Sequence, residues 1–112
     1  MSEVSDLEKQ LEDSKASIDR RDQALKLYRN PEFKRLILDE FCGTECARYA
    51  QLSADPSLNQ EQRADALAMA QASGHLRRFL SVIVQMGNQA EGLMDRLTDE
   101  IQAAREEEQE GV

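Results

Sequence analysis

The chain has 112 residues, the usual size of one domain, and its formal net charge is −8. A charged content of 32% and only five aromatic residues, three Phe and two Tyr, argue against a thick globular core. The acids concentrate at the end: residues 1–94 hold 15 acidic and 12 basic residues, and residues 95–112 hold seven and two. Because a nucleic-acid binder needs a basic stripe to neutralise phosphates, this charge argues against direct nucleic-acid binding.

The N-terminus combines no basic start with an apolar stretch, so we expect no signal peptide. The longest nearly uncharged apolar run, FLSVIVQMG at 79–87, is far shorter than the roughly 20 residues of a membrane-spanning helix. We therefore expect a protein without membrane insertion that works in the cytoplasm and keeps its cysteines as thiols.

The first segment, about 4–29, has the heptad pattern of a helix that packs against another helix. One row of the seam is apolar throughout: Val4, Leu11, Ile18 and Leu25. The row three residues further on is mixed: Leu7, Ser14, Arg21 and Tyr28. A polar Ser14 and a charged Arg21 weaken the seam but help to fix its register, which predicts a particular partner helix.

The Asn-Pro pair at 30–31 predicts a second helix over about 31–53, because Asn is a good N-cap and Pro is favoured at the first helical position. Gly43 inside this helix costs about 1 kcal/mol relative to Ala, which suggests close approach of a neighbouring backbone. The next stretch, SADPSLNQEQ, predicts a loop at 54–59. The second helix carries a broad apolar face, made of Phe33, Ile37, Leu38, Phe41, Cys42, Cys46, Tyr49 and Ala50.

The third segment, about 60–108, predicts a long helix with another seam. Its central row repeats every seven residues: Leu76, Ile83, Ala90, Leu97 and Ala104. Rows on both sides are apolar, with Phe79, Met86 and Leu93 on one and Leu80, Gly87, Met94 and Ile101 on the other. The Ser73-Gly74 pair could kink or break the helix, which the sequence leaves open. The acidic tail, 95–112, is interpreted most simply as a solvated helix end.

The helix lengths indicate the fold. A helix over 60–108 would be roughly 73 Å long at 1.5 Å per residue, and the first two helices end to end come to nearly the same. This predicts a single all-α domain over 1–112, an elongated, coiled-coil-like antiparallel hairpin in which the kinked first pair packs on the long third helix. The alternative is a compact three-helix bundle, opened at Asn30 into a true turn.

Cys42 and Cys46 stand four residues apart, so both sulfurs lie on one side of a helix. Two thiolates can bind one edge of a metal, but a closed zinc site takes about four ligands and His75 is the only histidine. Helical spacing also points the two Cβ atoms in directions unsuited to a disulfide. We therefore expect core packing and no metal or cofactor, and a contact between subunits remains the alternative.

The sequence predicts no catalytic residue and no enzyme. His75, Arg77 and Arg78 could bind a carboxylate or phosphate, but a solvated helix face is the simpler interpretation. No serine lies in a nucleophile-elbow motif, no Gly-rich loop follows a strand, and the carboxylates are dispersed along helix faces.

The run FLSVIVQM points side chains in more directions than a two-helix seam can cover, so some of them are expected to meet a partner. Leaving several aliphatic side chains in water is costly, since burying each contributes about 1.5 to 3 kcal/mol. We predict self-association as a homo-oligomer, or docking on another protein. The candidate interaction residues are Leu76, Phe79, Leu80, Val82, Ile83, Val84, Met86, Leu93 and Leu97.

Two stretches, RRDQALKLYRNPEFKRLILDEFCGTECARYAQLSADPSL and GHLRRFLSVIVQMGNQAE, resemble a family of small tailed-bacteriophage proteins. These proteins are found among virion and head-assembly genes, mostly without assigned activity. The resemblance implies a structural or assembly protein that contacts capsid, portal or scaffold subunits in the host cytoplasm, with incorporation in the virion left open. The alternative is a small acidic phage regulator that binds and inhibits a host protein.

Overall fold

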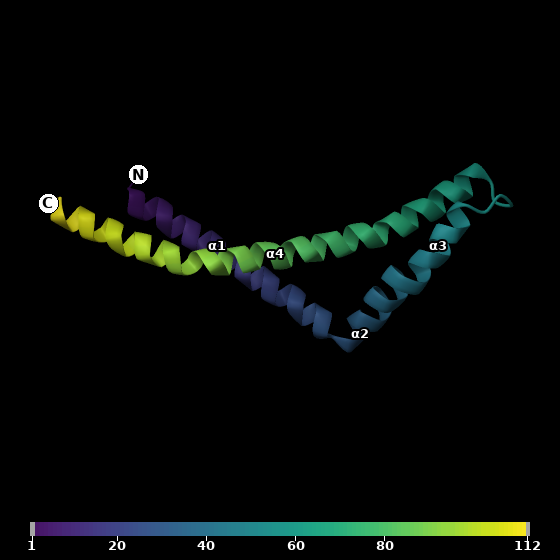
Figure 1. Ribbon diagram of the computed structural model, residues 1–112, viewed down its shortest axis with the longest axis horizontal. Coiled ribbons are helices and arrows are strands. Elements are labelled where there is room, and N and C mark those ends of the chain that lie inside the picture. The colour runs from purple at the N-terminus through teal and green to yellow at the C-terminus, as the bar shows by residue number, and fades with distance from the viewer. Residues whose placement is uncertain (1, 112) are drawn as a thin grey trace. The chain divides into compact units, whose positions relative to one another are not determined.

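The computed structural model describes residues 2–111, and the protein is all-α, without strands in that range. Met1 and Val112, which the predicted domain includes, lie outside the described residues. Four helical segments precede the return helix α4, and Figure 1 shows their order. The elements are α1 (Glu3–Arg29), α2 (Pro31–Phe33), the π-helix η1 (Lys34–Glu45), α3 (Cys46–Ser53) and α4 (Gln60–Glu110).

The chain forms two compact units. Unit 1 consists of Met1–Ala24 and Ile83–Val112, and unit 2 is Leu25–Val82. Both units therefore contain part of α1 and part of α4.

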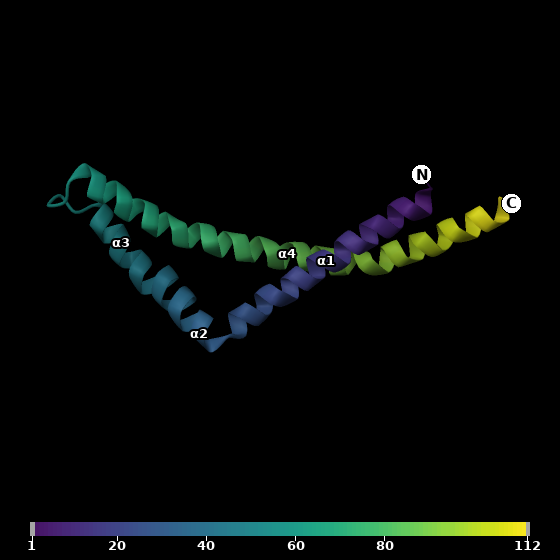
Figure 2. The ribbon, with the colours of Figure 1, turned by 180° about the vertical axis from the view of Figure 1, so that it is seen from behind.

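Unit 1 is a pair of antiparallel helices, in which the start of α1 and the end of α4 lie at the same end (Figures 1 and 2). Its core is one layer thick, with Leu7 of α1 against Leu97, Ile101 and Ala104 of α4. Val4 and Leu11 pack on this cluster. The heptad predicted for α1 is confirmed by burial, because every seam position from Val4 to Tyr28 is buried or half-buried.

The mixed row of the α1 seam contains a close contact between Arg21 and Gly87. A Cβ built on Gly87 would lie 2.1 Å from the Cβ of Arg21, so only glycine leaves room for the arginine stem. The Arg21 side chain is 12% exposed, and its guanidinium pairs with Glu91 and donates to Asn88 Oδ1 at 3.1 Å. A charged residue in the seam thus has one position on α4 that accommodates it, which fixes the register of the two helices.

Unit 2 begins with the turn between α1 and α2. Asn30 is the N-cap of α2, and its side chain accepts from the amides of Glu32 and Phe33 at 2.9 and 3.0 Å. Tyr28 and Phe33 meet edge to face across the turn, with ring centroids 6.4 Å apart. From there η1 and α3 lead to the loop at 54–59, where α4 begins (Figure 1).

The second helix is interrupted by π geometry, which the sequence did not predict. The twelve residues of η1 have π-helical hydrogen bonding, in which the amide of residue i donates to the carbonyl of residue i−5. Half-buried residues recur in pairs every four positions through η1 and into the start of α3, at 37–38, 41–42 and 45–46. A four-residue repeat suits an apolar row on either helix type, so side-chain spacing does not distinguish them.

The structure corrects the expectation for Gly43 and shows that α4 continues through Gly74. Gly43 was expected to admit a neighbouring backbone, but a Cβ there would meet only its own turn, 3.7 Å from the Leu38 carbonyl oxygen, so this expectation is wrong. The close approach is at Gly87. The helix is not broken at Ser73-Gly74, because α4 is helical throughout Gln60–Glu110.

Candidate interaction surfaces

The nine predicted interaction residues divide by exposure into three sets: buried, half-buried and exposed. Leu80 of unit 2 and Leu97 of unit 1 are buried, each 5% exposed. Four are exposed on α4, namely Phe79 and Val82 in unit 2 and Met86 and Leu93 in unit 1, and Leu76, Ile83 and Val84 are half-buried. The four exposed side chains can meet a partner while the buried ones keep their packing.

In unit 1, a shallow groove runs between α1 and α4 on the flank where Met86 and Leu93 are exposed. We call it the Met86 groove. Its cavity volume is about 190 Å³, below the roughly 300 to 1,000 Å³ of small-molecule sites. Three small side chains, Ser14, Ser17 and Ala90, leave room for a close approach, and Asp13 is its one charged lining residue. Its lining residues are Asp13, Ser14, Ser17, Met86, Gln89, Ala90 and Leu93.

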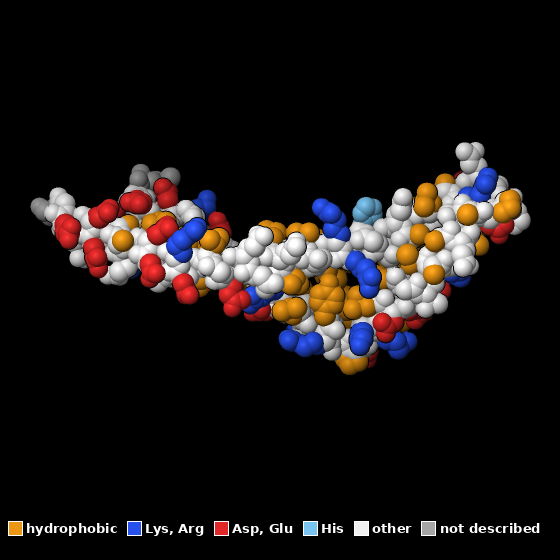
Figure 3. Space-filling model, in the orientation of Figure 1, with side chains coloured by type: hydrophobic (Ala, Val, Ile, Leu, Met, Phe, Trp, Pro, Cys, Tyr) orange, Lys and Arg blue, Asp and Glu red, His pale blue; other side chains and the backbone are white. Residues whose placement is uncertain are grey.

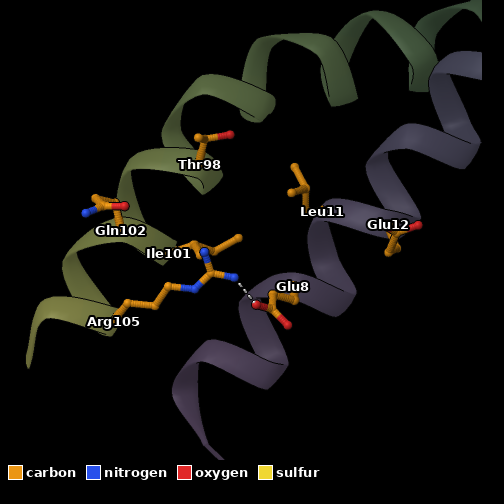
Figure 4. Close-up of a pocket in the computed structure, with 7 residues that line it drawn as sticks. All are labelled: Glu8, Leu11, Glu12, Thr98, Ile101, Gln102 and Arg105. Atoms are coloured by element: carbon orange, nitrogen blue, oxygen red, sulfur yellow. Dashed lines mark hydrogen bonds and ion pairs between the residues drawn. The ribbon is translucent and has the colours of Figure 1, made fainter. Parts of the chain in front are cut away.

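A second groove of unit 1 has polar walls, and we call it the Glu8 groove (Figure 4). Leu11 and Ile101 form its apolar part, and its volume is about 360 Å³. Arg105 of α4 reaches across to the Glu8 carboxylate of α1, as Figure 4 shows. The cation of the same chain thus already neutralises the carboxylate that would otherwise attract a ligand.

Unit 2 exposes more apolar surface and lacks a thick core. Its buried residues are Ala66, Ser73 and Leu80, all on α4. Phe79 is the most exposed of the large apolar side chains in the described chain, at 57%. Others in this unit are exposed by more than a third: Leu27, Leu36, Leu67 and Val82.

Both cysteines are half-buried and turned toward α4. The Cys42 thiol lies 3.8 Å from the Ser73 carbonyl oxygen, and the Cys46 thiol lies 3.6 Å from that of Ala70. These weak donor contacts are those of packed thiols. Over residues 2–111, no three His, Cys, Asp or Glu side chains gather in a way that could hold a metal ion.

Charge separates the two units. Unit 1 contains 15 acidic and six basic residues, a formal net charge of −9, whereas unit 2 contains seven and eight, a net charge of +1. Figure 3 shows carboxylates crowded on the part of the molecule that carries the chain ends. The predicted basic cluster, made of His75, Arg77 and Arg78, is exposed.

Local ion pairs shift a few pKa values. The hydrogen bond from Arg21 to Glu91 raises the pKa of the Arg21 guanidinium, and a similar bond from Arg48 lowers the pKa of the Glu45 carboxyl. In the loop, the backbone amide and then the hydroxyl of Ser57 lower the pKa of Asp55. All three are contacts that hold helices or turns, so they act on stability.

Sequence reasoning missed the α1 wall of the Met86 groove. Asp13 and Ser17 are outside the apolar seam, and Ser14 was interpreted as a weak seam position. The heptad did contain a signal, because Ser14 places a small side chain where the α4 row offers Met86 and Leu93. Pairing these residues needs the register of the two helices, which one periodicity does not supply.

Within residues 2–111, no helix is both long enough and apolar enough to cross a bilayer. No protein-family model, no curated protein and no solved structure matches the chain.

Proposed function

We propose that this protein is a non-enzymatic structural or assembly component that acts through helix–helix contacts, both with copies of itself and with other proteins. The observation that carries the proposal is the exposed apolar side chains on α4 beside the buried seam: Phe79, Val82, Met86 and Leu93. In the described chain no large side chain is less than 2% exposed, so the helices bury little apolar surface against one another. A second layer of helix would supply the missing burial.

Unit 2 is the surface through which copies associate. Its net charge of +1 imposes little repulsion between copies, whereas two units 1 would each contribute −9. Phe79 and Val82 supply apolar contact, and each such side chain contributes about 1.5 to 3 kcal/mol when fully buried.

The resemblance of the sequence to small tailed-phage proteins supplies the context of the proposal. The partners would be capsid, portal or scaffold subunits, met in the host cytoplasm during head assembly, and the protein could leave the cell inside the virion. Mass spectrometry of purified virions tests this, because a structural component is expected in many copies per particle.

Self-association is tested by light scattering after gel filtration. The wild-type chain of 12.7 kDa is expected to elute as an oligomer, and the double variant Phe79→Ser/Val82→Ser as a monomer. The matched control, Met86→Ser/Leu93→Ser, makes the same kind of change in unit 1 and should keep the wild-type mass. A monomeric wild-type chain at about 100 μM contradicts the self-association.

The acidity of unit 1 favours a second candidate function, a phage regulator that binds and inhibits a host protein. Absence from virions, together with one host protein that co-purifies in a fixed ratio and loses activity on binding, would favour the regulator. Many copies in each virion would exclude it as the main role.

A further inference from the structure

The Met86 groove has the shape and lining of a helix-docking site. Its wall is formed by Met86 and Leu93, two exposed apolar side chains seven residues apart, and Ala90 lies between them. A helix presents apolar side chains at positions i, i+3, i+4 and i+7, the spacing that such a row can receive. The small side chains of Ser14 and Ser17 on the α1 side let a third helix come close.

The negative charge of unit 1 determines which kind of helix the Met86 groove would bind. Asp13, the one charged lining residue, is acidic, and the groove belongs to a unit of net charge −9. A second unit 1 would bring the same charge to the contact, and anionic lipid or nucleic acid would be repelled in the same way. A helix with flanking Lys and Arg is attracted by this field and has Asp13 as a direct ion-pair partner.

We propose that the Met86 groove binds a basic amphipathic helix of a partner protein. The apolar face of that helix packs on Met86, Ala90 and Leu93, and its lysines or arginines face Asp13 and the acidic surface of unit 1. The proposal rests on the proposed docking function and specifies the chemistry of the partner for one surface.

The probe is a fluorescent synthetic helix of about 18 residues, with Leu at i, i+3, i+4 and i+7 and Lys or Arg on its other face. Its binding to the full-length protein is measured by fluorescence anisotropy at about 0.15 M salt. A second peptide of identical composition, with the leucines scrambled around the helix, carries the same charge and is the control. We expect the amphipathic peptide to bind at least about tenfold more tightly than the scrambled one.

Two variant pairs locate the site. Met86→Ser/Leu93→Ser is expected to weaken binding about tenfold, whereas Phe79→Ser/Val82→Ser in unit 2 should leave it unchanged. Asp13→Asn is expected to weaken it about threefold, and Glu110→Gln, which removes one charge from the same unit outside the groove lining, should have less effect.

Three results would overturn the proposal. Equal binding of both peptides would show attraction by charge alone, and no binding would exclude a basic helix. Loss of oligomer mass in Met86→Ser/Leu93→Ser would show that a second copy fills the groove. If the variant loses oligomer mass, the proposed self-association is still supported. If the peptides bind equally or not at all, self-association is decided independently by light scattering on the wild-type chain.

Discussion

The two units of this chain are both helical, but they differ in the side chains that stabilise them. Unit 1 is held by an aliphatic seam around Leu97 and Ile101 and has no aromatic residue, whereas unit 2 contains all five aromatics, both cysteines and the only histidine. Unit 1 carries a net charge of −9 and unit 2 carries +1. The stability of unit 1 therefore comes from regular packing working against charge repulsion, and that of unit 2 from a wide, half-buried face.

The difference has a consequence for binding. A highly charged unit resists contact with copies of itself and favours partners of opposite sign, while a nearly neutral unit with exposed apolar side chains can self-associate. One short chain can thus have two surfaces with separate partners. The predictions below test whether the units are separable in stability as well.

The largest expected effect comes from shortening a buried leucine in each unit. Leu97 in unit 1 and Leu80 in unit 2 are both 5% exposed, so Leu97→Ala and Leu80→Ala are matched changes. Each should lower the free energy of unfolding by about 2 to 3 kcal/mol, measured by urea denaturation. Hydrogen exchange should accelerate mainly in the unit that carries the change. Equal acceleration in both units by either variant would show one cooperative body.

A smaller effect is expected at the glycine that admits Arg21. Gly87→Ala places a Cβ against the arginine stem, so despite the higher helix propensity of Ala it should lower the free energy of unfolding by about 1 to 2 kcal/mol. Gly92 is the control, because a Cβ there has no heavy atom within 4 Å beyond the local backbone of its own helix, and Gly92→Ala should raise stability by about 0.5 to 1 kcal/mol. Equal changes at both positions would mean that Arg21 moves aside at no cost.

Gly87 and Gly43 also show which features of the fold can be predicted from the sequence and which cannot. Heptads predicted the helices and the buried row, because periodicity is a local property that side chains impose on any partner. The seam also indicated that Arg21 fixes register, but its partner, Gly87, could not be identified, since pairing depends on how far one helix slides along the other. Close approach was instead assigned to Gly43, where a Cβ would meet only the Leu38 carbonyl oxygen of its own helix at an ordinary contact distance.

The same limit applies to the candidate surface. The sequence singled out nine apolar residues, but their division into the buried Leu80 and Leu97 and the exposed Phe79 and Met86 follows from which flank of α4 is covered by the preceding helices. The π geometry of η1 was missed because shifting a hydrogen bond by one residue barely changes a row of side chains that repeats every four.

A still smaller effect is expected from salt, which should change the stability of unit 1 more than that of unit 2. Raising ionic strength from about 0.01 to 0.15 M shortens the Debye length from about 30 to 8 Å, which weakens the repulsion within unit 1. Amide protection should therefore increase more in unit 1 than in unit 2, by an equivalent of less than about 1 kcal/mol. A variant with Glu106, Glu107 and Glu108 changed to Gln should respond less. An equal response in both units would show that the charge asymmetry does not affect stability.

The smallest expected effect is in the loop of unit 2, where Asp55 accepts from the Ser57 amide at 2.9 Å and its hydroxyl at 2.8 Å. These bonds lower the pKa of the folded carboxyl, so their stabilising contribution is present above the ordinary Asp value and is lost as pH falls through the lowered one. Asp55→Asn should therefore have a lower melting temperature than wild type at pH 6, and the difference should shrink below about pH 4.

Ser57→Ala is the matched control for that titration. It removes the hydroxyl donor and leaves the backbone amide, which is the larger cause of the lowered pKa. Its melting temperature is followed by circular dichroism from pH 6 to 3. The decrease caused by protonation of Asp55 should therefore be more than half as large as in the wild type. A pH dependence in Ser57→Ala as flat as in Asp55→Asn would show that the hydroxyl, and not the amide, holds the carboxylate in this turn.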